Sequence, residues 1–264
     1  MRKLEDIRQI INELDNVIIE KLSERFEAVD EVVQIKKEKQ LSIFDFNREK
    51  EIIKNIQNKD IYCSEEIAEI YQEIMRVSRK YQAKQLLPGN IFLIGFMGAG
   101  KSTIGKMLSS ITSFEFIDTD QMIEEKAQMK IPEIFEKEGE TYFRGLETEA
   151  LMEIKEDGNQ IISCGGGIVI KEENRKILKK KGKTIFLNGT AEVLLDRLGN
   201  DQQRPLFSAM QKQNEIEKKE RFKVLLDSRM PYYTEAADSI INVDEKIPEE
   251  IAQEILRVLI NLKG

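Results

Sequence analysis

Residues 95–103 read Gly-Phe-Met-Gly-Ala-Gly-Lys-Ser-Thr and directly follow the apolar run 91–94. The pattern G-x-x-x-x-G-K-[ST] between a strand and a helix is typical of a phosphate-binding loop. Its glycines let successive backbone amides turn toward phosphate oxygens, and the following helix presents its positive end to the same charge. The alternative is a glycine-rich turn that binds nothing. We expect ATP and Mg²⁺ to bind here, with contacts from Gly98, Ala99, Gly100, Lys101, Ser102 and Thr103.

A sharp change in composition precedes this loop. All fifteen glycines and all five prolines of the 264 residues lie at or after Pro88. Because glycine and proline are the strongest breakers of regular structure, the segment before Pro88 is predicted to be uninterrupted helix and the segment after it a different fold. We therefore predict two domains, one over residues 1–87 and one over residues 88–264.

The first domain is predicted to contain three helices and no strand. Apolar residues recur at helical spacing from Leu4 to Val33, which predicts one long helix over residues 3–38. Asp45 is placed to cap the start of a second helix, and a third carries the apolar positions from Ile67 to Val77. A long helix with two shorter partners leaves a thin core, so we expect a homodimer through the long helix.

The second domain is predicted to be an α/β fold. Short apolar runs alternate with amphipathic segments, which is typical of a parallel sheet with helices on both faces. Five strands are predicted, at 91–95, 114–117, 160–164, 184–188 and 239–243. Helices are predicted at 101–111, 119–129, 132–137, 140–156, 171–181, 190–198, 214–229 and 247–262.

Composition excludes several classes of function. With 41 basic and 48 acidic residues the net charge is -7, which gives no general attraction for nucleic acid or for an anionic membrane. Two cysteines provide no disulfide framework, and no apolar run approaches the roughly 18 residues that span a bilayer, so we expect a cytoplasmic protein. Histidine is absent, which excludes nucleophiles activated by imidazole. Phosphoryl transfer fits, because it depends on positioning and charge.

Three further motifs follow the phosphate loop in the second domain. Asp118-Thr119-Asp120 ends the second predicted strand, where the two acids could serve a metal ion and an acceptor hydroxyl or simply cap a helix. Arg144 lies early in a helix. Residues Gly165, Gly166 and Gly167 follow a strand, where they allow close approach of a ligand or form a plain turn.

In this order, and together with Arg204-Pro205-Leu206 and Arg229-Met230-Pro231, these motifs resemble shikimate kinase over residues 90 to about 262. The resemblance implies an α/β P-loop kinase that phosphorylates shikimate. It implies that Asp120 draws the proton from the attacking hydroxyl and that Asp118 holds the hydration shell of Mg²⁺, next to Ser102. It also implies that Arg144 and Arg229 bind the carboxylate and that the three glycines abut the ring.

Two arginines are assigned to the nucleotide by the same resemblance. Arg204 would close over ATP with the segment of about residues 198–213 and stabilise charge on the transferring phosphoryl group. Arg197 would stack on adenine, and its alternative is an exposed helix arginine. The chain departs from the family at residues 127–130, which replace the usual glycine-containing turn.

Charged and polar residues of the first domain form a second ordered set. They are Arg8, Arg25, Lys36, Asp45, Arg48, Glu49, Ser78 and Gln82. Their spacing resembles the all-helical class of chorismate mutase over residues 4 to about 83. The alternative is a helical dimerisation module without activity.

The resemblance implies that chorismate is rearranged to prephenate, a step that needs no nucleophile, only a compact conformer and stabilised charge. Arg8 and Arg25 would bind the two carboxylates, with Arg48 and Ser78 in support. Lys36 and Gln82 would donate to the ether oxygen, and Asp45 and Glu49 would hold the ring hydroxyl. Since Arg8 and Arg25 lie about 25 Å apart along one helix, we expect Arg8 to reach the partner subunit's site.

The leading hypothesis is a bifunctional enzyme of aromatic amino acid biosynthesis, with chorismate and shikimate as substrates. A second hypothesis keeps the kinase and makes the first domain a non-catalytic module that senses chorismate or prephenate. A third is a kinase for another small hydroxylated acid, which Arg144, Arg229 and the three glycines argue against.

Overall fold

The computed structural model describes residues 2–39, 41, 43–198 and 215–263. It divides between Leu86 and Leu87 into a helical unit and a larger α/β unit. None of the described helices combines the length and apolar character that crossing a membrane requires. The fold class predicted for each half of the chain is confirmed.

The helical unit consists of α1 (Leu4–Lys39), α2 (Phe46–Gln57) and α3 (Ser64–Leu86). Asp45 caps α2 as predicted, because its side chain accepts a hydrogen bond from the backbone N–H of Arg48. The helix α3 packs against α2 and α1. Only Val29 and Val33 of α1 are buried, so the core of this unit is thin.

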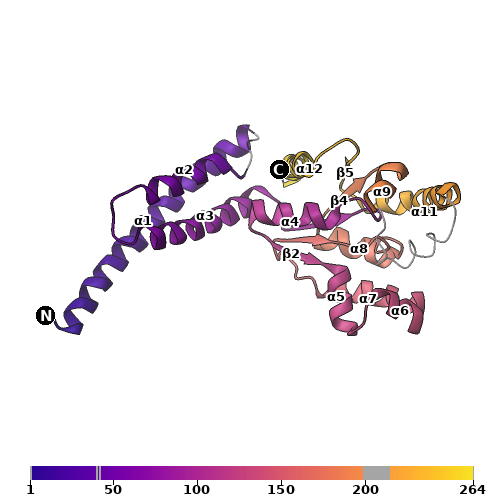
Figure 1. The fold of residues 1–264 in the computed structure, drawn as a ribbon, viewed down its shortest axis with the longest axis horizontal. Coiled ribbons are helices and arrows are strands. Elements are labelled where there is room, and N and C mark those ends of the chain that lie inside the picture. Colours follow the sequence, from indigo (N-terminus) through magenta and orange to yellow (C-terminus); the bar gives the residue numbers. More distant parts are fainter. Residues whose placement is uncertain (1, 40, 42, 199–214, 264) are drawn as a thin grey trace. The chain divides into compact units, whose positions relative to one another are not determined.

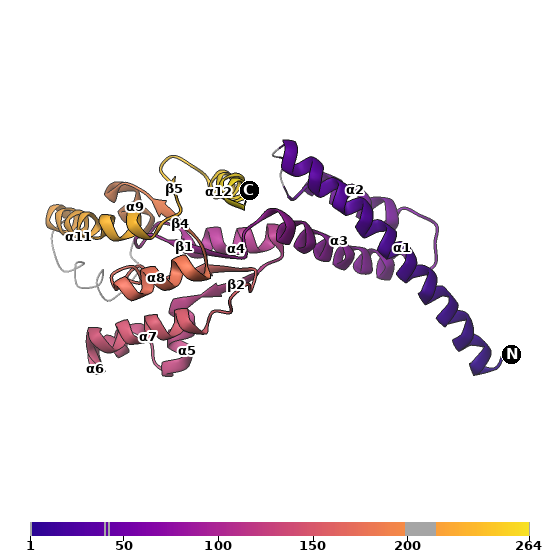
Figure 2. The same ribbon diagram turned by 180° about the vertical axis from the view of Figure 1, so that it is seen from behind.

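The N-terminal half of α1 extends beyond the other two helices of its unit, as the indigo end of the chain shows in Figure 1 and, from behind, in Figure 2. Its apolar side chains are between 38 and 64 % exposed; they are Leu4, Ile7, Ile10, Ile11, Leu14, Val17, Ile18 and Ile19. Within one chain this face has no apolar partner among the described residues. An exposed apolar surface of this extent marks a site of association.

The α/β unit is built on five parallel strands in the order β2-β3-β1-β4-β5. The strands are β1 (Asn90–Ile94), β2 (Glu115–Asp118), β3 (Gln160–Ser163), β4 (Gly182–Asn188) and β5 (Ser239–Asn242). The helices are α4 (Lys101–Thr112), α5 (Thr119–Ala127), α6 (Ile131–Lys137), α7 (Gly139–Glu153), α8 (Glu172–Lys181), α9 (Ala191–Leu198), α11 (Glu215–Ala236) and α12 (Pro248–Lys263). Every residue of the central strand β1 is buried, as its unbroken apolar run predicts.

The direction of each crossover places helices on both faces of the sheet. The chain moves from β1 to β2 in one direction along the sheet and from β3 to β4 in the other, and right-handed crossovers therefore put α4 and α8 on opposite faces. Contacts agree, because α4 packs against α12 whereas α8 packs against α7 and α11. The helices α5, α6 and α7 gather beside β2 around a small apolar core of their own (Figure 1).

The predicted end of one helix is wrong. A proline ordinarily ends a helix, and residue 229 was the expected end, yet α11 continues through Pro231 to Ala236. Tyr233 explains the extension, because its fully buried ring stacks on Phe186 with centroids 4.8 Å apart. Packing of this last turn against the sheet outweighs the hydrogen bond that the proline removes.

Candidate active sites

The phosphate-binding loop connects β1 to α4 and takes the conformation that its glycines allow. Gly98 and Gly100 have φ of 84° and 83°, in the left-handed region that favours glycine. A Cβ on Gly98 would also collide with the carbonyl of Leu194 on α9. The Lys101 ammonium donates to the carbonyl oxygens of Gly95 at 2.9 Å and Phe96 at 3.2 Å, so it lies across the loop where phosphate would bind.

The two residues predicted to serve the metal lie together. Ser102 Oγ donates to Asp118 Oδ2 at 2.8 Å and lies 3.1 Å from Ser163 Oγ. The other oxygen of Asp118 accepts from the backbone N–H of Asp120, so Asp118 also caps α5. One hydroxyl and one carboxylate fit Mg²⁺, which prefers oxygen ligands and takes its remaining ligands from water and phosphates.

A cavity of about 550 Å³ adjoins the loop. It is lined by loop residues from Gly98 to Thr103 and by Arg197, at the end of α9. Arg197 is exposed, and its guanidinium donates to the carbonyl of Val243 at 2.8 Å. Its contact with adenine stays a prediction. Arg204 lies outside the described residues.

Two lining residues of this cavity escaped the sequence reasoning. Lys246 and Pro248 follow β5, and the Lys246 ammonium pairs with Glu254 at 2.6 Å. Their position after β5 could have indicated them, because ligands of parallel sheets bind beyond the carboxyl ends of the strands and β5 ends at that edge.

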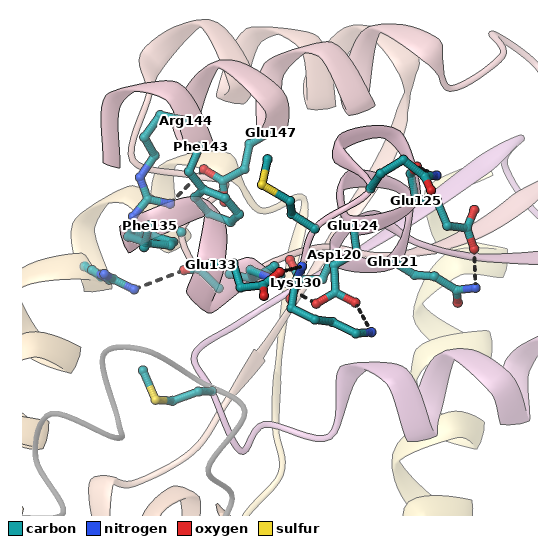
Figure 3. Close-up of a pocket in the computed structure, with 17 residues that line it drawn as sticks. Asp120, Gln121, Glu124, Glu125, Lys130, Glu133, Phe135, Phe143, Arg144 and Glu147 are labelled. Atoms are coloured by element: carbon teal, nitrogen blue, oxygen red, sulfur yellow. Dashed lines mark hydrogen bonds and ion pairs between the residues drawn. The ribbon is translucent and has the colours of Figure 1, made fainter. Parts of the chain in front are cut away.

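A larger cavity, of about 820 Å³, lies on the other side of the same loop. Met97 lines this cavity and the next residue, Gly98, lines the first, so the loop separates the two. Five predicted substrate residues line the larger cavity: Asp120, Arg144, Gly166, Gly167 and Arg229. Figure 3 shows Asp120 from α5 and Arg144 from α7 among the residues around it.

Arg144 is held by two carboxylates of its own helix. Its Nη1 donates to Glu147 at 2.7 Å and its Nη2 donates to Glu140 at 2.8 Å (Figure 3 labels Arg144 and Glu147). The Glu147 side chain is 1 % exposed and that of Glu140 is 63 % exposed. Gly167 lies against Arg144 so closely that a Cβ would occupy the position of the guanidinium. A small residue is therefore required at this position.

The carboxyl of Glu147, in the same cavity, has a strongly perturbed pKa. Burial raises its pKa to about 7, although Arg144 opposes that shift. Its Oε1 has no hydrogen-bond partner among the described residues. The sequence alone assigned no role to Glu147. Its i, i+3 spacing from Arg144 was the signal that the two side chains meet on one helix face.

Residues of α11 complete the cavity. Tyr233 donates its hydroxyl to the carbonyl of Gly166 at 2.5 Å, and the Arg229 guanidinium donates to the same carbonyl at 3.4 Å. On the opposite side of the glycine turn, the N–H of Gly165 donates to Thr119 Oγ1 at 2.9 Å. A Cβ on Gly165 would collide with the Asp120 carboxylate. The guanidinium groups of Arg144 and Arg229 thus line the same cavity as Asp120, beside the phosphate loop, which suits a small hydroxylated carboxylic acid.

Gln128, which follows α5, explains how residues 127–130 form a turn without the glycine that the family usually has there. Gln128 ends α5 with φ of 52°, a left-handed conformation that favours glycine. Its side chain donates to the carbonyl of Glu125 at 2.6 Å, which stabilises the turn locally. A non-glycine residue is therefore accommodated in a turn of the same shape.

The helical unit holds a second polar cluster. Lys36 donates to Gln82 Oε1 at 2.9 Å and to the carbonyl of Ile43 at 2.7 Å. Arg25 donates to Ser78 Oγ at 2.5 Å. Burial lowers the pKa of Lys36, against the opposing effect of Asp45 and Glu49. The cluster therefore joins residues of α1, α3 and the start of α2.

Two predicted residues lie apart from this cluster within one chain. Arg8 is exposed on the projecting half of α1, and Arg48 pairs with Glu51 at 2.9 Å on the surface of α2. Sequence reasoning also missed Arg79, which pairs with Glu49 and lies over the ring of Phe44. No motif pointed to Arg79, since it lies one position beyond Ser78 on α3.

The family model for shikimate kinase matches residues 97–260, more than half of the chain. The chain belongs to the shikimate kinase family. The shikimate kinase of Caldanaerobacter subterraneus subsp. tengcongensis is 41 % identical over 175 residues, which are 66 % of this chain and 98 % of that protein. A solved shikimate kinase from Acinetobacter baumannii, in complex with shikimate, has a TM-score of 0.63 and 36 % identity and covers 70 % of this chain and 98 % of its own.

A second solved shikimate kinase, from Bacteroides thetaiotaomicron, has a TM-score of 0.59 at 37 % identity and covers 65 % of this chain and 98 % of its own. The family model for chorismate mutase type II matches residues 7–83, within the helical unit. The chain is therefore an enzyme that combines a chorismate mutase region with a shikimate kinase unit, and kinases of this family use ATP.

Proposed function

We propose that one chain catalyses two reactions of aromatic amino acid biosynthesis. The α/β unit transfers the γ-phosphoryl group of ATP to the 3-hydroxyl of shikimate, and the helical unit rearranges chorismate to prephenate. The observation that carries the kinase proposal is the position of Asp120, in a cavity with Arg144 and Arg229 next to the phosphate-binding loop. The observation that carries the mutase proposal is the cluster joined by Lys36 and Gln82.

In the kinase reaction, Arg144 and Arg229 bind the carboxylate of shikimate and so direct a hydroxyl toward Asp120. The hydroxyl oxygen bonds to the γ-phosphorus, the bond from that phosphorus to the bridging oxygen breaks, and ADP leaves. Asp120 accepts the proton that the hydroxyl loses. The loop amides and Lys101 hold the phosphates. Ser102 and Asp118 would hold Mg²⁺, which neutralises developing phosphate charge when bound.

In the mutase reaction, the polar cluster stabilises charge on the breaking ether oxygen and holds chorismate in a compact conformer. Lys36 is half-buried, which strengthens its electrostatic effect. Since Gln82 Oε1 accepts from Lys36, the Nε2 end of that amide is the one that can donate to the ligand. Arg25, fixed by Ser78, binds a carboxylate.

The helical unit acts as a homodimer in this proposal. The apolar positions Leu4, Ile7, Ile11, Leu14 and Ile18 recur at alternating spacings of three and four on the exposed face of α1. That spacing suits packing against a second helix of the same kind. Arg8 flanks this face and lies apart from the polar cluster of its own chain. A second copy would therefore bring the partner's Arg8 to that cluster.

Two substitutions in the full chain test the assignment. Lys101→Ala should abolish phosphorylation of shikimate and spare the loss of chorismate absorbance. Arg25→Ala should do the reverse. Loss of both activities in either variant would contradict independent sites. Binding of chorismate without turnover by the wild-type protein would instead favour a sensing module.

A further inference from the structure

Arg79 occupies an unusual position in the helical unit. Its guanidinium pairs through Nη1 with Glu49 Oε2, although the two residues belong to different helices. The side chains are only 16 % and 23 % exposed. By contrast, the ion pairs Lys21–Glu24, Arg48–Glu51 and Arg76–Glu73 each lie within one helix and are 46–63 % exposed. A half-buried pair between helices constrains geometry far more than an exposed pair within one helix.

A second contact holds the same guanidinium. Its central carbon lies 5.1 Å from the ring centroid of Phe44, in the segment that leads into α2. A guanidinium over an aromatic face is attracted by the ring quadrupole, and the planar group is thereby oriented as well as held. Arg79 therefore fixes the start of α2 at two points, the ring of Phe44 and the carboxylate of Glu49.

The charged groups around Glu49 show why its ion pair with Arg79 matters. Lys36 faces Glu49 from α1, Arg79 faces it from α3, and Asp45 lies at the start of its own helix. The Glu49 carboxylate raises the pKa of Lys36, against the lowering effect of burial, and so favours the charged ammonium. Without Arg79, Glu49 would lose its ion-pair partner, and the Lys36 ammonium, which already interacts with Glu49, would become an alternative partner. Such a pair would draw Lys36 away from the ligand. A ligand with two carboxylates would also repel an uncompensated Glu49.

We propose that Arg79 is a positioning residue of the mutase site, which holds Glu49 directed to the ligand's hydroxyl and leaves Lys36 for the ether oxygen. The inference rests on the proposed mutase activity. It adds a third cation, supplied by α3, to the set formed by Lys36 and Arg25. The Nε of Arg79 is buried and has no hydrogen-bond partner among the described residues, so the group has a further donor directed into the protein.

The test uses the full chain with Arg79→Met, Arg79→Lys and Arg76→Met as a matched control one turn earlier on α3. Arg79→Met should lower kcat for chorismate by about 10-fold or more with a smaller change in KM, since one positioned charge is worth about a factor of ten. Arg79→Lys should restore most of the lost kcat, because the cation beside Glu49 is retained. Arg76→Met should behave like wild type.

A double-mutant cycle with Glu49→Gln decides whether Arg79 acts through Glu49. We expect Arg79→Met to add little to the loss that Glu49→Gln causes. Additive losses, or a wild-type kcat for Arg79→Met, would overturn the inference. Shikimate phosphorylation by the same preparations verifies that the chain is intact, and Arg79→Gln, which also removes the charge, takes the place of Arg79→Met in the cycle if Arg79→Met does not fold. A wild-type chain that turns over no chorismate would refute the mutase proposal itself.

Discussion

Shikimate should bind with proton uptake because of Glu147. Burial raises the pKa of this carboxyl to about 7, so the unliganded protein holds it partly protonated at neutral pH. A ligand carboxylate bound to Arg144 adds negative charge to the guanidinium that Glu147 contacts at 2.7 Å. The bound complex therefore favours protonated Glu147. The affinity for shikimate is therefore highest below pH 7 and falls as the pH rises through 7.

The size of the effect can be estimated from the geometry. Two carboxylates on opposite sides of one guanidinium lie about 6 Å apart, which at an effective dielectric constant of about 20 gives a repulsion of about 3 kcal/mol. This energy corresponds to a factor of about 100 in the affinity of Glu147 for its proton. With half-protonation of the free enzyme near pH 7, the Kd for shikimate should be about 10-fold higher at pH 8 than at pH 6.

Isothermal titration calorimetry of the full chain at pH 6, 7 and 8 measures this dependence. Glu147→Gln, which is neutral at every pH, should give a nearly constant Kd. Glu140→Gln is the matched control, because Glu140 binds the same arginine from an exposed position, and it should retain the slope of wild type. A wild-type Kd that does not change with pH, or an unchanged slope in Glu147→Gln, would refute the reasoning.

Three other expectations concern packing and backbone geometry. Ile11→Glu on the exposed face of α1 should lower the mass measured by analytical ultracentrifugation and reduce chorismate turnover with kinase activity unchanged; an unaltered mass would count against the homodimer. Gly167→Ala should raise the KM for shikimate by about 10-fold, because its Cβ would displace Arg144. Gly145→Ala, whose Cβ would meet nothing within 4 Å, should leave that KM unchanged. Ser113→Gly should stabilise the α/β unit by about 1 kcal/mol in calorimetry, since Ser113 ends α4 with φ of 58°; a lower transition temperature would contradict this.

Much of the fold could be predicted because local patterns and tertiary packing agree. The apolar run at 91–94 became a strand buried on both faces, and the glycine-rich loop after it took left-handed backbone angles. Helix α11 is the exception. Local sequence placed its end before Pro231, but the buried ring of Tyr233 lies two residues later and its contacts come from β4 and the glycine turn. Such contacts between distant segments leave no local signal.

The same difference between local patterns and contacts of distant segments applies to the residues of the candidate sites. Residues that belong to ordered motifs, such as Lys101, Asp120 and Arg144, could be proposed from the sequence because those motifs resemble a known family. Lys246 and Arg79 could not be proposed in this way, because neither belongs to a motif: Lys246 follows the last strand, and Arg79 meets Glu49 of another helix. Their contributions depend on which strand end or helix face lies opposite.

The sequence by itself determined the all-helical first part, the five-stranded parallel sheet of the second part and the resemblance to both families, because glycine content, apolar periodicity and motif spacing are local properties. Only the tertiary structure decided the protonation of Glu147 and the pairing of Arg79 with Glu49. The burial of a side chain and the charges that act on it depend on which groups surround it in three dimensions. The nearest of those groups can be dozens of residues away along the chain.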